Sequence, residues 1–145
     1  MEDKRIQRID KSYIKFLNVV NKQPISSHYS ISDEYTITVQ RISHDVFMVY
    51  VAYENKPPLI AQLQLPSDIH NYIKSFLHTK HKINSFIAYT EQYPFRPPKW
   101  SIVHATKELN HQLIQFNQSL EESWLPCLNF ENDILCYLVW AIQQL

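Results

Sequence analysis

The sequence predicts an α+β domain: an N-terminal helix, an antiparallel four-stranded meander, and further helices packed on the sheet. Three observations favour this class. Apolar residues recur at helical spacing near both ends of the chain, strand-like runs lie between them, and two proline-containing bends interrupt the second half. The chain has 145 residues, 45% of them hydrophobic, which is enough for one core, so we expect a single domain over residues 1–145.

The first helix is expected over roughly the first twenty residues, because apolar side chains recur there at helical spacing and Pro24 ends the pattern. The apolar positions are Ile6, Ile9, Tyr13, Phe16, Leu17 and Val20. A basic stripe runs along another face of this helix and consists of Lys4, Arg8, Lys11 and Lys15. Such stripes are usually only solvated; the functional interpretation is a face that docks a partner.

Strands are predicted where apolar and polar residues alternate or where β-branched and aromatic residues gather. Residues 35–39 alternate, as in a strand with one covered face, and residues 46–53 form a run typical of a central strand. Residues 84–89 and 100–105 are expected to add two more, which completes the meander. Residues 59–65 are a further strand candidate.

Three further helices are expected. An amphipathic pattern that opens at Ser67 predicts an extra helix near residues 67–79, inserted between strands. The next helix is expected to be capped by Thr106, and the last by Asn129 or Asn132. The apolar residues of the helix after Thr106 are Leu109, Leu113, Phe116 and Leu120.

Composition excludes several functional classes. The 14 basic and 14 acidic side chains give a formal charge of zero, so we expect no nucleic-acid partner. No apolar run is long enough for a signal peptide or a membrane span, so we expect no membrane partner and a cytoplasmic protein, with a nuclear location also compatible. The sequence contains no Gly, which rules out a Gly-rich phosphate loop, and no cofactor is expected.

No metal site is expected either. Cys127 and Cys136 have no second Cys pair and no nearby His at zinc-ligand spacing. His78 and His81 flank the end of the predicted extra helix without a third ligand. Both cysteines lie in apolar sequence, where a thiol is usually an inert core residue with a raised pKa.

Two motifs resemble the ubiquitin-conjugating enzymes. The Tyr-Pro bend (residues 93–99, Tyr-Pro-Phe-Arg-Pro-Pro-Lys) is similar to the bend after the third strand of that family. The Trp-Pro bend (residues 124–127, Trp-Leu-Pro-Cys) is similar to its Trp-x-Pro segment, and residues 4–7 resemble the start of its first helix. The resemblance implies a UBC-like fold with an inserted helix and without the family's C-terminal helix pair. The RWD domain shares a Tyr-Pro bend and is a related neighbour.

The resemblance does not extend to the catalytic residues. In the family, a Cys roughly eight residues before the Trp carries ubiquitin as a thioester, and the Asn of a His-Pro-Asn tripeptide steadies the oxyanion. Phe116 stands at that Cys position, and no Cys lies between Trp100 and Trp124. His104 is not followed by Pro and Asn. We therefore expect no catalytic residue and no enzyme; a displaced nucleophile at Cys127 is the alternative.

The family docks its ligases and activating enzymes on the first helix and on both bends. This implies that the partner-binding residues here are Lys4, Arg5, Phe95, Pro126 and Cys127. Arg8 joins them through the basic stripe. A core position for Phe95 is the alternative interpretation.

Two functions are compatible with these features. The first is a non-catalytic conjugating-enzyme variant that binds or scaffolds a protein partner: ubiquitin, a conjugating enzyme or a ligase. The alternative is a structural or assembly protein, for example of a viral particle or a large complex, that reuses the fold without a ubiquitin role. The alternative rests on the inserted helix and on nine Tyr, seven Phe and three Trp residues that could serve interfaces.

Overall fold

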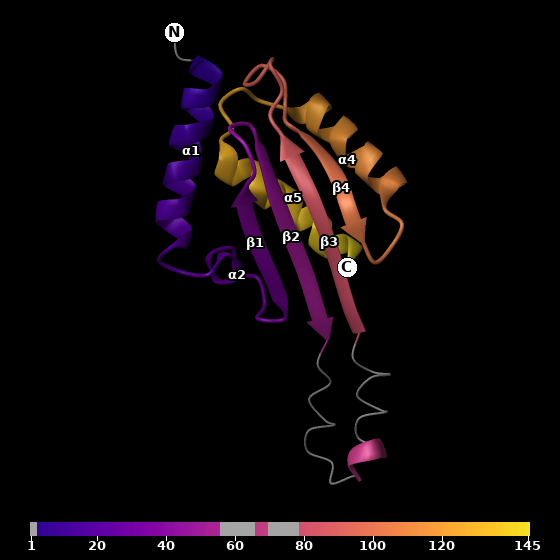
Figure 1. The fold of residues 1–145 in the computed structure, drawn as a ribbon. Helices are drawn as coiled ribbons and strands as arrows, with labels where there is room; N and C mark the ends of the chain where they lie inside the picture. Colours follow the sequence, from indigo (N-terminus) through magenta and orange to yellow (C-terminus); the bar gives the residue numbers. More distant parts are fainter. Residues whose placement is uncertain (1–2, 56–65, 70–78) are drawn as a thin grey trace.

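The computed structural model describes residues 3–55, 66–69 and 79–145 (Figure 1). Within these ranges, helices precede and follow a four-stranded sheet. The elements are α1 (Lys4–Val20), α2 (Ile25–His28), β1 (Tyr35–Arg41), β2 (Val46–Asn55), β3 (Thr79–Ala88), β4 (Lys99–Ala105), α4 (Asn110–Ser123) and α5 (Phe130–Gln144).

The strands form one antiparallel sheet in the order β1-β2-β3-β4, so each strand pairs with the next along the chain. The register places Val49 of β2 opposite Val39 of β1 and opposite Ser85 of β3. The predicted α+β class, N-terminal helix and four-stranded meander are confirmed.

The predicted insertion falls between β2 and β3. The strand candidate at residues 59–65 lies outside the described residues, as does most of the helix predicted near residues 67–79. Residues 67–69 are helical, whereas Thr79 already pairs with Asn55 in the sheet. The strand expected from residue 84 thus begins earlier, at Thr79, because the long partner strand β2 extends the pairing of β3 back to that residue.

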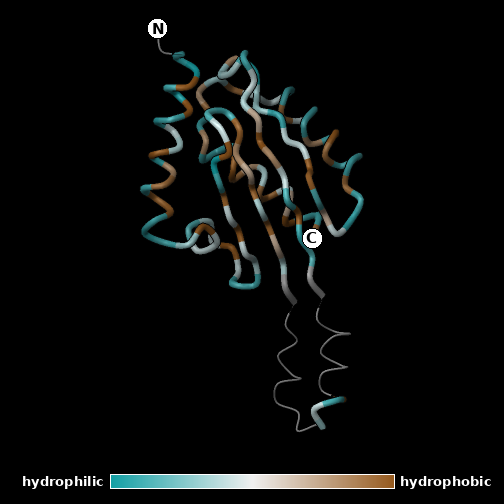
Figure 2. Tube along the Cα trace, in the orientation of Figure 1, coloured by the Kyte–Doolittle hydropathy of each residue, from teal (hydrophilic) through white to brown (hydrophobic). Residues whose placement is uncertain are grey.

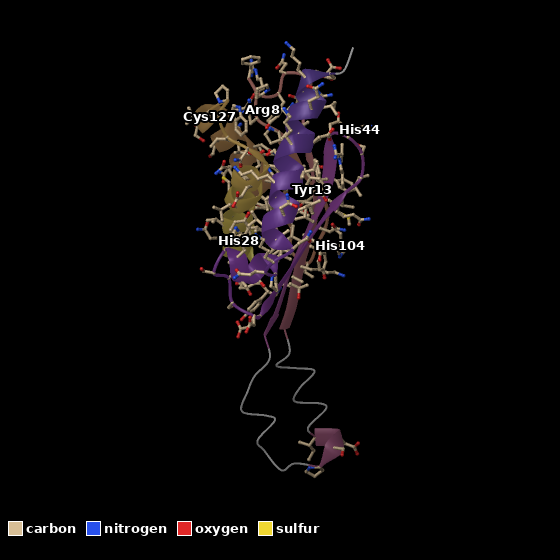
Figure 3. The ribbon with its side chains drawn as sticks, turned by 90° about the vertical axis from the view of Figure 1, so that its left-hand side faces the viewer. Arg8, Tyr13, His28, His44, His104 and Cys127 are labelled. Carbon is tan, nitrogen blue, oxygen red and sulfur yellow. The ribbon has the colours of Figure 1, made fainter. Side chains whose placement is uncertain are left out.

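One face of the sheet is covered by helices. Alternate residues of β2 and β3 share that face and are fully buried: Phe47, Val49, Val51, Ile83, Ser85 and Ile87. Helix α5 crosses behind the sheet, and α1 lies beside it (Figures 1 and 3). Hydrophobic and hydrophilic positions alternate along α1 in Figure 2, as expected for a helix with one buried face.

Aromatic side chains form the centre of the core. The ring of Phe130, which begins α5, lies 4.6 Å from that of Phe47 and 5.1 Å from that of Phe16, centroid to centroid. Toward β4, the ring of Trp100 stacks on that of Tyr137 with a centroid distance of 3.8 Å. These contacts join α1, α5 and the sheet into one core.

The last two helices begin differently. The Asn129 side chain accepts from the Asn132 backbone N–H, and the Asn132 side chain accepts from that of Asn129, so the predicted cap of α5 is confirmed. The predicted cap of α4 at Thr106 is wrong, because α4 begins only at Asn110. The Thr106 hydroxyl instead accepts from the Lys82 N–H at 3.1 Å and extends the pairing of β3 with β4.

Candidate partner-docking site

The Tyr-Pro bend leaves one large aromatic side chain in solvent. It follows β3 and contains a cis peptide between Tyr93 and Pro94. Tyr93 is 3% exposed, and Pro97 and Pro98 are buried, whereas Phe95 is 80% exposed. The alternative core position for Phe95 is therefore wrong, because the buried residues on either side turn its ring outward.

The Trp-Pro bend packs directly against the Tyr-Pro bend. The indole Nε1–H of Trp124 donates to the carbonyl oxygen of Pro94 at 2.7 Å. Next to Trp124, Leu125 is 56% exposed, and Pro126 and Cys127 are exposed as well. The two bends thus present neighbouring apolar side chains on a fixed backbone. The sequence did not indicate Leu125 as a site residue, because patterns of apolar spacing predict burial only within helices and strands.

We expect Trp124→Phe to lower the free energy of unfolding by about 1 kcal/mol, because it leaves the Pro94 carbonyl without its donor. Chemical denaturation measures the change. Trp140→Phe is the matched control, since Trp140 contacts Phe116 through its ring at 5.2 Å. Equal destabilisation by both substitutions would contradict the role given to the Trp124 hydrogen bond.

Arg8 joins α1 to both bends. Its Nη2 donates to the carbonyl oxygen of Pro126 and, at 3.4 Å, to that of Leu128. Its guanidinium also lies over the ring of Tyr93, 5.7 Å from the centroid. Figure 3 places Arg8 and Cys127 side by side at one end of the molecule. Arg8 therefore supports the backbone of the candidate site while lying at its edge.

Arg5 is held inside the molecule. Its Nη1 donates to the carbonyl oxygen of Tyr89 at 2.9 Å and forms an ion pair with Asp45 at 3.3 Å. Only 15% of the side chain is exposed. Arg5, which was expected to contact a partner, thus connects α1 to the sheet, and little of its side chain is accessible for binding.

The basic stripe borders a hollow of about 450 Å³ between α1 and the start of α5. Lys4, Lys11 and Lys15 line it together with Asn129. In the part of the chain that the structure describes, none of these lysines forms an ion pair. Their charges are therefore open to solvent beside Arg8 and the Trp-Pro bend.

The stretch in which the resemblance placed the catalytic position is a helix. Phe116 is 8% exposed and packs on the rings of Tyr137 and Trp140. Its neighbour Asn117 faces the Tyr-Pro bend region instead, where its amide bonds the backbone N–H and carbonyl of Trp100 at 3.1 and 3.0 Å. A cleft of about 630 Å³ lies between this bend and α4, lined in part by Gln92, Pro97, Ile114 and Gln118.

Both cysteines are free and exposed, so the expected core positions of Cys127 and Cys136 are wrong. Cys136 lies on the side of α5 away from the fully buried Ile134 and Leu138. Partial burial and then the charge of Asp133 raise the pKa of the Cys136 thiol, which disfavours a reactive thiolate. His104 is exposed on β4.

Among the residues that the structure describes, no group of three or more His, Cys, Asp or Glu side chains could hold a metal ion. His81 lies on β3, and His78 lies outside the described residues. In the same ranges, no helix combines the length and the apolar character needed to cross a bilayer.

Neither the models of protein families nor the curated protein sequences contain one that matches this chain significantly. The proposed function therefore rests on the geometry of the two bends.

Proposed function

We propose that this protein is a non-catalytic docking module that binds a protein partner through its two bends. The observation that carries the proposal is the exposure of Phe95, at 80%, on a bend that Trp124 locks to its neighbour. We define the docking surface as Phe95, Leu125, Pro126 and Cys127, with Lys4 and Arg8 at its edge.

The physical properties of this surface favour protein binding. An exposed aromatic ring on a fixed backbone can enter a partner's pocket at a small cost in conformational entropy. Leu125 adds a second apolar side chain next to it, and the unpaired lysines of α1 supply a charged border. An apolar centre with a polar rim is the usual anatomy of a protein interface.

The class of partner is inferred from the resemblance. Both bends resemble the segments on which conjugating enzymes meet ligases and activating enzymes, so we propose ubiquitin, a conjugating enzyme or a ligase as the partner. The buried Phe116 at the nucleophile position supports a role without catalysis. A cytoplasmic or nuclear location is part of the same proposal.

Binding to a panel of ubiquitin, conjugating enzymes and ligase domains tests the proposal. We expect Phe95→Ala to weaken the complex by about tenfold or more, because an aromatic anchor at the centre of an interface contributes over 1 kcal/mol. Ile42→Ala is the matched control, since Ile42 is also exposed, at 51%, but follows β1. No binding to any member of the panel would refute the proposed partner class.

The absence of catalysis has its own test. We expect no reductant-sensitive adduct after incubation with activating enzyme, ATP and ubiquitin, because Phe116 stands where the resemblance places the nucleophile and Cys127 lies eleven residues further on, on an exposed bend. Gel electrophoresis with and without reductant detects such an adduct. An adduct that Cys127→Ser abolishes would identify Cys127 as a displaced nucleophile.

A second candidate function is assembly. It is favoured by exposed apolar side chains on α4 and α5, namely Ile114, Leu135 and Val139. Leu135 and Val139 are four residues apart and share one face of α5. Sedimentation of the native protein tests this candidate, and a free monomer as the sole species would count against it.

A further inference from the structure

A buried carboxyl group lies behind the docking surface. Asp133, in the first turn of α5, accepts a hydrogen bond from the hydroxyl of Tyr89 at 2.6 Å. Each of the two residues is only 3% exposed. A buried carboxylate is costly unless it is paired with a charge or well hydrogen-bonded, so the protonation state of Asp133 depends on its neighbours.

The groups around Asp133 come from three parts of the chain. The Tyr89 hydroxyl, from the segment after β3, bonds Asp133 directly, and the ring of Tyr93 lies 4.6 Å from that of Tyr89, centroid to centroid. Arg8 of α1 lies over the Tyr93 ring, and Cys136 follows Asp133 on α5. Burial raises the pKa of Asp133 to about 7, while the hydrogen bond from Tyr89 and the charge of Arg8 act in the opposite direction. At the same end of α5, Glu131 pairs with His28 at 3.3 Å.

Arg8 is the link between this carboxyl group and the docking surface. The guanidinium of Arg8 lies over the ring of Tyr93, which packs on the ring of Tyr89, the hydrogen-bond donor to Asp133. The same guanidinium donates to the carbonyl oxygens of Pro126 and Leu128. An ionised Asp133 attracts Arg8, whereas a neutral Asp133 does not. The charge on Asp133 thus acts on the side chain that fixes the Trp-Pro bend.

We propose that Asp133 is a proton-sensitive control of the docking surface: ionised, it holds Arg8 against the Trp-Pro bend, and protonated, it loosens that hold. The inference concerns regulation of the site and rests on the proposed function for its biological meaning. The coupling itself, between a proton on Asp133 and the backbone of the bend, is present in the free protein and needs no partner. Such a coupling is reciprocal, so the position of Arg8 must also change the proton affinity of Asp133.

Nuclear magnetic resonance on the free protein between pH 5 and pH 9 tests the coupling. We expect the carboxyl carbon of Asp133 and the amide signals of Leu125 and Leu128 to titrate with one common midpoint. Arg8→Gln should move the Asp133 midpoint upward by about one pH unit, since it removes a neighbouring positive charge. Lys11→Gln, on the same helix, is the matched control and should leave the midpoint in place.

Asp133→Asn should abolish the titration of the amide signals of the bend. This result would distinguish an effect of Asp133 from an effect of His28. If Asp133→Asn does not fold, Tyr89→Phe replaces it: loss of the hydroxyl donor should raise the common midpoint. Bend signals that stay constant with pH, or equal midpoint shifts in Arg8→Gln and Lys11→Gln, would overturn the inference. No partner is present in this experiment, so its failure would not contradict the proposed docking function. In the same way, a failure to bind the panel of partners would not contradict the coupling between Asp133 and the bend.

Discussion

Replacement of Phe130 by alanine is expected to lower the free energy of unfolding by about 4 kcal/mol, within the range for removal of a buried aromatic side chain. The ring is 1% exposed and contacts the rings of Phe16, Phe47 and Tyr13. Its loss leaves a cavity where α1, α5 and β2 meet, and the surrounding rings cannot close it without leaving their rotamers.

Urea denaturation monitored by circular dichroism measures this change. Phe95→Ala is the matched control, because it removes the same side chain from a position that is 80% exposed and should change stability by less than about 0.5 kcal/mol. A similar cost at both positions would mean that Phe130 is not the centre of the core.

Stability is expected to decrease as the pH rises from 4 to 8. The folded-state pKa of Asp133, about 7, lies above the ordinary value of 3.8, so between these values the folded protein binds more protons than the unfolded chain. A raised carboxyl pKa therefore stabilises the fold at low pH, and this contribution disappears as the pH passes 7. The loss amounts to at most about 4 kcal/mol, at 1.36 kcal/mol per pKa unit.

Denaturation at a series of pH values, on the wild type and on Asp133→Asn, measures this dependence. The difference in stability between the two proteins isolates Asp133 from every other titrating group. We expect the difference to change between pH 4 and pH 8 in favour of the variant. A difference that is constant with pH would show that Asp133 keeps an ordinary proton affinity in the folded protein.

The elements that sequence predicts well are those whose pattern has one cause. The apolar repeat of residues 6–20 places α1 correctly because a single helix face is buried. The alternation in β1 and the apolar run of β2 locate both strands. The prediction of Thr106 as a helix cap was wrong because its hydroxyl accepts a hydrogen bond from Lys82 beside the pairing of β3 with β4.

The candidate site was only half predictable, because its geometry depends on contacts between distant residues. Sequence located both bends and Phe95, yet it could not separate Arg5, which the sheet holds, from Arg8, which joins the bends. Nor could it find Asp133, since an acidic residue in the first turn of a helix is usually an exposed partner of the helix dipole. Only the fold brings Asp133 to Tyr89.

If both bends form one docking surface, a single partner must contact both of them. Chemical-shift mapping with the labelled protein and each unlabelled member of the panel tests it most directly. We expect the largest changes at Phe95, Leu125 and Cys127, with smaller ones at Lys4, and we expect Phe95→Ala to remove them. Changes confined to the uncovered face of the sheet, or to the exposed face of α5, would contradict it.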